Sequence, residues 1–203
     1  MKKYNTAFPY FPKDDIEEIL KETRDILIGN KMLTMGENVQ KFEEQFAKYC
    51  QTKYAVATNS CTSALEIALS SLNLTSEDEV IVPVQTFVAT GSCVLKSGAK
   101  IVFCDVDDDF LLDFEFMKRL INKNTKAVII VHFAGMISKD IIKIKEYLQE
   151  KNIALIEDDA HAHGATFGEL KSGSIGDFGC FSFYSTKIMT TGEGGMITTN
   201  NQE

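Results

Sequence analysis

The chain has 203 residues, of which 44% are hydrophobic and 25% charged, and 21 lysines and arginines against 29 aspartates and glutamates give it a net charge of −8. This composition is typical of a globular domain and excludes intrinsic disorder and collagen-like architectures, and the acidic balance argues against a general nucleic-acid binder. No apolar run approaches the roughly 20 residues that a membrane-spanning helix needs, and Asp14 and Asp15 arrive before any signal-peptide core, so we expect a cytoplasmic protein.

The N-terminal region predicts an extended arm followed by two helices. Pro9 and Pro12 lie within the arm Phe8–Pro12, and a residue that precedes proline disfavours the helical conformation. Apolar side chains recur at helical spacing from Asp14 to Ile28, which predicts an amphipathic helix that Gly29 ends. A second helix is predicted from the stripe Val39, Phe42, Phe46 and Tyr49.

From residue 54 onward, short apolar runs alternate with helical stretches. The predicted strands are the runs 54–57, 80–82, 101–104, 127–131 and 153–156. The predicted helices lie near 62–73, 87–97, 114–121 and 139–151. Because the apolar runs are continuous, we expect strands that are covered on both faces. The alternation predicts an α/β fold with a mostly parallel sheet flanked by helices.

The end of the chain departs from this rhythm. Two β-like runs, Gly179–Tyr184 and Gly195–Thr199, are joined by a segment that contains Lys187 and the glycine-rich stretch Gly192–Gly195. No helix follows the second run to cover it. We therefore expect either that the last strands lie on an antiparallel edge or that the chain is part of a longer protein.

The cysteines, at positions 50, 61, 93, 104 and 180, are odd in number and form no Cys-x-x-Cys pair. This pattern is typical of neither a disulfide framework nor a zinc ribbon. We predict reduced thiols that are mostly buried.

The first candidate site is the turn Asn59–Leu65, where a predicted strand gives way to a helix. A helix N-terminus offers unpaired N–H groups and a positive potential that bind phosphate, and the hydroxyls of Thr62 and Ser63 would add donors. Serine and threonine are also the preferred capping residues of helices, so the turn taken alone favours a structural cap.

The second candidate site is the stretch Ile156–Ala165, which carries acidic residues and histidines directly after a buried strand. His161 and His163 could share a metal ion, although a third protein ligand is not obvious. Alternatively, Asp158 could hold a cationic ring nitrogen with a histidine nearby. A solvated polar loop is the third interpretation.

The third candidate site is Lys187, which follows the aromatic, apolar run Gly179–Tyr184 and precedes the glycines. A lysine beside apolar surface can become nucleophilic enough to form a Schiff base. Most lysines are simply exposed, and for Lys187 taken in isolation this interpretation is favoured.

Together, these three sites resemble the pyridoxal-phosphate-dependent sugar aminotransferases of the DegT/DnrJ/EryC1/StrS family. The resemblance also covers the stretches 78–83, 86–90, 125–129, 176–187 and 192–195, in the same order. It implies the large domain of a fold-type I transferase, in which residues 1–50 form an arm and helices and residues 51–203 form an incomplete cofactor-binding domain. The rest of that domain and a small C-terminal domain would be missing after Glu203.

The resemblance implies a role for particular residues. Lys187 matches the lysine that carries pyridoxal 5′-phosphate as a Schiff base, and Asp158 matches the acid that pairs with its pyridine nitrogen. Phe87 matches the aromatic residue that lies on the cofactor ring, and His161 falls near the ring oxygen. The phosphate-binding residues would be Thr62, Ser63 and Ser182. Cys61 departs from the family pattern, which commonly has glycine there.

The implied reaction moves an amino group from an amino acid, by analogy glutamate, to a nucleotide-linked keto sugar during polysaccharide or glycan precursor synthesis. The implied assembly is a homodimer that uses no metal, nucleic acid or membrane. A sugar dehydratase with the same cofactor is an alternative, but the resemblance implies histidine in place of Lys187 in such enzymes. The sequence is also compatible with a non-catalytic or regulatory member of the family, and with a metal hydrolase that uses Asp158, His161 and His163.

Overall fold

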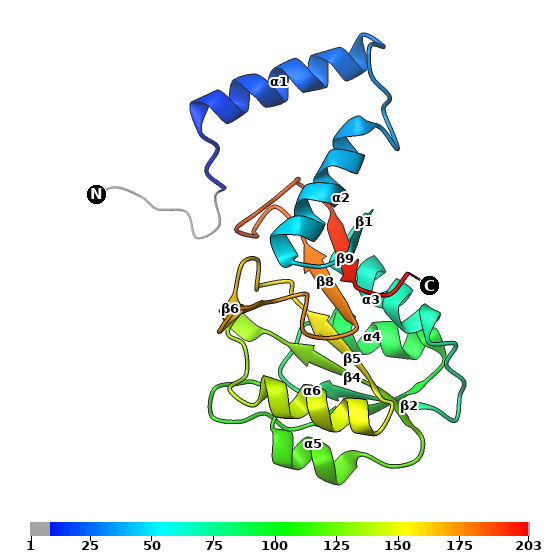
Figure 1. The fold of residues 1–203 in the computed structure, drawn as a ribbon. Helices are drawn as coiled ribbons and strands as arrows, with labels where there is room; N and C mark the ends of the chain where they lie inside the picture. Colours follow the sequence, from blue (N-terminus) through cyan, green and yellow to red (C-terminus); the bar gives the residue numbers. More distant parts are fainter. Residues whose placement is uncertain (1–8, 203) are drawn as a thin grey trace.

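The computed structural model describes residues 9–202, and its centre is one mixed β-sheet (Figure 1). The order of the seven strands in this described region is β1-β9-β8-β5-β4-β2-β3. Neighbouring strands are parallel from β8 to β3, whereas β9 is antiparallel to both β8 and β1. The strands are β1 Tyr54–Thr58, β2 Glu79–Pro83, β3 Lys100–Cys104, β4 Thr125–Val131, β5 Ala154–Asp158, β8 Phe178–Ser182 and β9 Gly195–Thr199, with a separate hairpin of β6 Thr166–Phe167 and β7 Leu170–Lys171.

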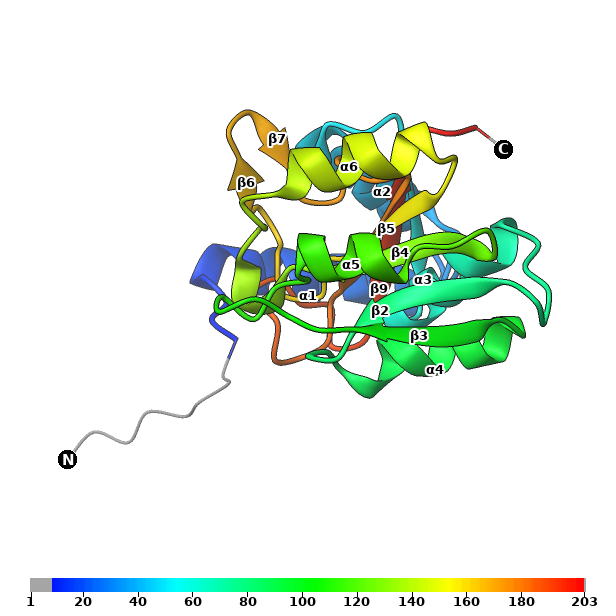
Figure 2. The same ribbon diagram turned by 90° about the horizontal axis from the view of Figure 1, so that it is seen from below.

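Helices cover both faces of the sheet, and Figure 2 shows α5 and α6 on one side and α4 on the other. On the first face, α3 and α4 bury Leu65 and Val94 against alternate strand residues such as Ile156. On the opposite face, α5 and α6 bury Met117 and Ile144 against the intervening strand residues. The helices are α1 Lys13–Leu27, α2 Glu37–Cys50, α3 Cys61–Ser71, α4 Val88–Ser97, α5 Phe114–Leu120 and α6 Ile141–Glu150, with a 3₁₀ turn η1 Phe133–Gly135.

The predicted α/β fold with a mostly parallel sheet is confirmed, and every predicted strand and helix is present with ends shifted by a few residues. The expectation that the last strands lie on an edge is wrong, because β9 is inserted between β8 and β1. Helices from earlier in the chain cover β9: Ile197 packs in the cluster with α3, and Met196 packs against Phe46 of α2. No later helix is needed for its burial.

The edge strands also differ from expectation. Val56 of β1 and Phe103 of β3 are exposed, although continuous apolar runs predicted cover on both faces. An edge strand has a neighbour on one side only, and the helices here gather over the middle of the sheet.

The predicted N-terminal helix is amphipathic, but α1 buries none of its residues against the described chain. Figure 1 shows α1 standing away from the sheet. Its apolar side chains Ile16, Ile19 and Leu20 are exposed. The preceding arm is not helical over residues 9–12, as predicted, and its first residue, Phe8, lies outside the described residues.

All five cysteines are free and buried, which confirms the predicted reduced thiols. Each helix within residues 9–202 is too short or too polar to cross a bilayer.

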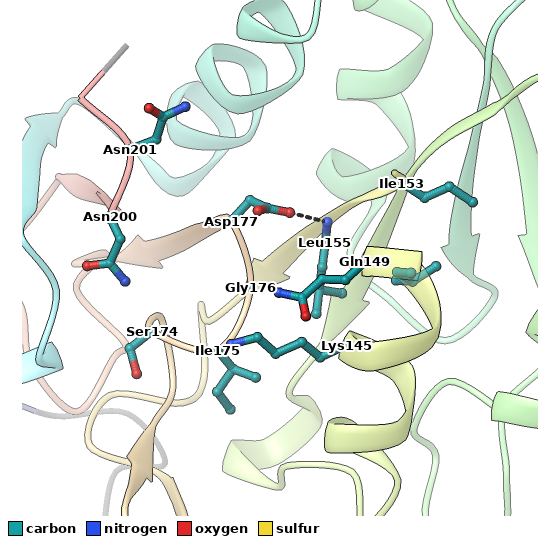
Figure 3. Close-up of a pocket in the computed structure, with 11 residues that line it drawn as sticks. Lys145, Gln149, Ile153, Leu155, Ser174, Ile175, Gly176, Asp177, Asn200 and Asn201 are labelled. Carbon is teal, nitrogen blue, oxygen red and sulfur yellow. Dashed lines mark hydrogen bonds between the residues drawn. The ribbon is translucent and has the colours of Figure 1, made fainter. Parts of the chain in front are cut away.

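The amino ends of β5 and β8 border a small cavity of about 210 Å³ (Figure 3). Asp177, just before β8, accepts a hydrogen bond from the Leu155 N–H at 2.8 Å and so joins the two strands. Lys145 and Gln149 of α6 line the same cavity. The cavity therefore lies at the opposite end of these two strands from Asp158 and Ser182, which are the last residues of β5 and β8.

Candidate active site

A cavity of about 460 Å³ lies where β4, β5 and β8 end. The carboxyl ends of parallel strands are where α/β proteins place their ligands, and the volume falls in the range of about 300–1,000 Å³ that is usual for small-molecule sites. The lining residues come from the turn before α3 and its first residues, the start of α4, the ends of β4 and β5, and the end of β8 with the loop after it. They are Ser60, Cys61, Thr62 and Leu65; Thr86, Phe87 and Ala89; Val131 and Phe133; Asp158, Ala160 and His161; and Ser182, Tyr184, Thr186, Lys187, Glu193 and Gly194.

The fold brings the separately predicted site residues to this one cavity. Its wall contains the following predicted residues: Thr62, Phe87, Asp158, His161, Ser182 and Lys187. Ser63 is the exception. Its hydroxyl donates to Asn59 Oδ1 at 2.5 Å, and its N–H donates to Ser60 Oγ at 3.2 Å, so both groups are engaged within the turn.

The turn that precedes α3 satisfies both interpretations offered for it. Ser60 is the N-cap of α3, as the structural interpretation predicted. Cys61 and Thr62, in the first turn of the helix, nevertheless line the cavity. The N–H groups of a first turn have no intrahelical partner and carry positive potential, so this end of the cavity favours an anion such as phosphate.

The turn rests directly on the start of β9. A Cβ atom added to Gly195 would lie 2.3 Å from the Ser60 carbonyl carbon and 2.7 Å from the Cys61 nitrogen. Only a residue without a side chain lets the two backbones approach this closely. The glycine-rich stretch in the sequence therefore positions the helix N-terminus at the cavity.

Asp158 forms the polar floor of the cavity and is only 5% exposed. Its Oδ2 atom accepts a hydrogen bond from the Thr90 hydroxyl at 2.8 Å, and its Oδ1 atom accepts one from the Ala160 N–H at 3.2 Å. The Cys61 sulfur lies 3.7 Å from Oδ1. Burial and this neighbouring carboxylate raise the pKa of the Cys61 thiol, so Cys61 remains protonated and unreactive near neutral pH.

Lys187 is half-buried and lines the cavity, which contradicts the simple exposed interpretation. Its N–H donates to the Tyr184 carbonyl at 2.9 Å, within a loop closed by the bond from the Phe183 N–H to the Gly194 carbonyl. Desolvation and the Lys187 cation lower the pKa of His161, and Asp158 opposes them. His161 therefore senses both charges, and the imidazole is mainly neutral near pH 7.

His163 does not reach the cavity. Its ring lies between Phe181 and Phe183, with centroid distances of 5.4 and 5.5 Å. Within residues 9–202, the side chains close enough to share a metal ion are those of His132, Glu157 and Asp159, so His161 and His163 do not pair as the metal interpretation required.

Burial of His163 makes stability depend on pH. Burial lowers the pKa of the folded ring from 6.5 to about 4, so between these values the unfolded chain binds a proton that the folded chain does not. Stability is then lost as pH falls through this window, by up to about 3 kcal/mol. We expect urea unfolding at pH 7.5 and pH 5 to show a smaller loss in His163→Leu than in the parent chain. The exposed His161, changed to Asn, serves as the control and should keep most of the loss. Equal losses in His163→Leu and the parent would contradict the prediction.

A buried polar network lies on the other side of β5. Glu157 Oε1 accepts hydrogen bonds from the N–H groups of Ile175 and Gly176 at 2.8 and 2.7 Å, and Oε2 lies 2.8 Å from His132 Nε2. Burial and the neighbouring carboxylates raise the pKa of Asp159, which favours the protonated acid. Because Glu157 is already satisfied by N–H donors, we interpret this network as a support for the loop before β8.

Sequence reasoning missed several residues of the site. Thr86 comes just before Phe87, the N-cap residue of α4, and Thr90 lies within the helix, so only the structure shows that their hydroxyl oxygens lie 2.7 Å apart. His132, which belongs to the network on the other side of β5 and not to the cavity, follows β4 directly, just as Asp158 ends β5, so the rule that singled out Asp158 could also have found it. The involvement of Tyr184 and Glu193 depends on how the loop 183–194 folds, which no spacing reveals.

Comparison with known proteins gives the same family that the sequence resembles. The profile of the DegT/DnrJ/EryC1/StrS aminotransferase family matches residues 13–203. The chain is 44% identical over 171 residues to GDP-perosamine synthase of Caulobacter vibrioides, covering 84% of this chain and 46% of that protein. It is 40% identical over 205 residues to the spore coat polysaccharide biosynthesis protein SpsC of Bacillus subtilis, covering 100% of this chain and 52% of that protein.

Comparison with solved structures agrees with this family match. The aminotransferase from Psychrobacter cryohalolentis superposes with a TM-score of 0.88 at 38% identity, covering 96% of this chain and 49% of that one. The E. coli GDP-4-keto-6-deoxy-D-mannose-3-dehydratase with bound hydrated PLP superposes with a TM-score of 0.87 at 31% identity, covering 98% of this chain and 52% of that one. The chain spans about half the length of the curated relatives it matches.

Proposed function

Because the chain belongs to the DegT/DnrJ/EryC1/StrS aminotransferase family, we propose that it is the cofactor-binding part of a pyridoxal-phosphate-dependent sugar-nucleotide aminotransferase. The observation that carries this proposal is one cavity lined by a lysine, a buried aspartate and a helix N-terminus. The enzyme would transfer an amino group from an amino acid, by family analogy glutamate, to a nucleotide-linked keto sugar.

The residues around the cavity fit pyridoxal phosphate at both ends. The first turn of α3 offers unpaired N–H groups and the Thr62 hydroxyl for the phosphate, and Ser182 lies at the same cavity. Asp158 offers a nearly buried carboxylate whose natural partner is a protonated ring nitrogen. Phe87 would lie on the face of the ring, and His161 would lie near its oxygen.

When bound, pyridoxal phosphate supplies an electron sink that stabilises negative charge on the substrate carbon. The protein's own residues would supply the other groups that the reaction needs. Lys187 would provide the amine that attaches the cofactor and an acid and base that moves a proton at Nζ. Asp158 would hold the proton on the ring nitrogen. The apolar walls, including Leu65 and Val131, exclude water.

The relatives support the wider context of the proposal. Their names place GDP-perosamine synthase and SpsC in nucleotide-sugar and polysaccharide chemistry, and we propose the same role here. A homodimer is supported by the exposure of Phe87 and Tyr184 at the cavity, since a second chain would cover them. Free cysteines support a reducing, cytoplasmic environment. We further propose that residues 9–50 form an arm and helices and that residues 51–202 belong to a cofactor-binding domain.

A sugar dehydratase is the second candidate function, because a dehydratase is among the similar structures. Lys187 argues against it, since histidine is expected in place of the lysine in such enzymes. A non-catalytic member that binds sugar or a partner is the third, because the chain spans about half of its relatives.

The decisive experiment incubates the protein and pyridoxal phosphate with a keto-sugar nucleotide and ¹⁵N-labelled glutamate, and follows the product by mass spectrometry. An aminosugar that carries the label supports the aminotransferase. A deoxygenated sugar without the label would indicate the dehydratase. Cofactor binding without either product would favour the non-catalytic alternative.

A further inference from the structure

Two threonine hydroxyls, one of the buried Thr90 and one of the half-buried Thr86, lie beside the aspartate of the cavity. We propose that Thr86 and Thr90 form a one-way hydrogen-bond chain that orients the Asp158 carboxylate toward the cofactor ring. Thr90 and Thr86 are thus positioning residues that act through Asp158. This inference rests on the proposed function.

The direction of the chain follows from proton counting. Thr90 Oγ1 lies 2.8 Å from Asp158 Oδ2, and an ionised carboxylate can only accept, so the Thr90 hydroxyl proton is committed to Asp158. Thr86 Oγ1 lies 2.7 Å from Thr90 Oγ1. Because the single proton of Thr90 is already used, Thr86 must donate to Thr90. Each donation makes the next hydroxyl a better donor, so the pair strengthens the bond to Asp158.

These hydrogen bonds fix the plane of the Asp158 carboxylate. Oδ2 is held by Thr90, and Oδ1 is held by the Ala160 N–H at 3.2 Å. An ionised carboxylate has about four acceptor positions, so one oxygen can still accept a further bond from the cavity side. Since Thr90 is fully buried and Asp158 nearly so, water does not compete for these bonds.

The same short segment also carries the aromatic residue of the site. Thr86 and Thr90 flank Phe87, whose carbonyl accepts a hydrogen bond from the Thr90 N–H at 3.1 Å. Both Thr86 and Phe87 line the cavity. One rigid helix start therefore places the ring that faces the cofactor and the hydroxyls that orient its carboxylate partner.

The test compares Thr90→Val, which removes the hydroxyl and keeps the branched shape, with Thr90→Ser, which keeps the hydroxyl. We expect Thr90→Val to bind pyridoxal phosphate about tenfold more weakly in equilibrium dialysis, and to change the pH dependence of the bound cofactor's absorbance. Thr90→Ser should restore both properties. Thr86→Val, which leaves Thr90 without its donor, should change both in the same direction but by less.

The outcomes separate this inference from the proposed function. If the parent protein binds the cofactor and Thr90→Val matches it in affinity and pH dependence, the inference fails alone. If Thr90→Val and Thr90→Ser are impaired equally, the effect is one of packing and the inference fails. If the parent protein does not bind the cofactor, both fail. If Thr90→Val does not fold, Thr86→Val is the test instead. Cofactor affinity and pH dependence equal to those of the parent protein in Thr86→Val would then overturn the inference.

Discussion

Lys187→Ala should remain unmodified when it is mixed with pyridoxal phosphate and reduced with borohydride, whereas the parent chain should gain the mass of one reduced cofactor. The reason is that Lys187 is a half-buried amine on the wall of the cavity that also holds Asp158. Only an amine can form the covalent link. In an amino-transfer assay, the loss of this acid and base should lower the rate by about 10³-fold or more.

A lysine in the other cavity provides the matched control. Lys145 lines the cavity at the amino ends of β5 and β8 (Figure 3), whereas Asp158 is the last residue of β5, at the opposite end of the strand. Lys145→Ala should gain the same single cofactor mass as the parent chain. Modification of Lys187→Ala at another lysine to the full extent, located by peptide mapping, would remove Lys187 from its proposed role.

Gly195→Ala is expected to damage both stability and cofactor binding. The added Cβ would lie 2.5 Å from the Ser60 carbonyl oxygen and 2.7 Å from the Cys61 nitrogen, and neither backbone atom can move without displacing the start of α3. Overpacking of this kind destabilises a protein by about 1–3 kcal/mol or more. Because the first turn of α3 is the proposed phosphate site, affinity for pyridoxal phosphate should fall by at least about tenfold.

Another glycine separates the effect of this contact from that of a methyl group as such. In Gly91→Ala, within α4, the new Cβ would lie 3.7 Å from Ile101 Cδ1, an ordinary contact. Alanine also favours a helix by about 1 kcal/mol over glycine. Urea unfolding and cofactor titration should therefore leave Gly91→Ala at least as stable as the parent and unchanged in affinity. A Gly195→Ala variant that behaved in the same way would show that the turn does not depend on this close approach.

Much of the fold could be predicted from the sequence, because the patterns that specify it are local. Apolar runs and helical spacing located the strands of the main sheet and the α-helices, although not the short hairpin of β6 and β7, and strand ends pointed to Asp158. The position of β9 could not be read in this way. Gly195–Thr199 looks like a last strand, but its neighbours in the sheet are decided by packing of Ile197 and Met196 under helices distant in sequence.

The candidate site was predictable where a single residue type carries the chemistry. Type and position made Lys187, Asp158 and the turn before α3 candidates, and the family resemblance then assigned their roles. Thr90 did not, because a buried threonine in a helix is ordinary until its distance to Asp158 is known. For His163 the residue type gave a wrong prediction: a histidine suggested a metal ligand, whereas its ring packs against two phenylalanines.

The place of β9 in the sheet also governs the order in which this site can be assembled on the ribosome. β1 finds its hydrogen-bonding partner in β9, nearly 140 positions later, and the turn after β1 rests on Gly195. A nascent chain therefore carries β1 and the start of α3 unpaired until residues 195–199 emerge from the exit tunnel. Contacts so distant in sequence slow folding. The turn before α3 is therefore synthesised long before the strand that completes it.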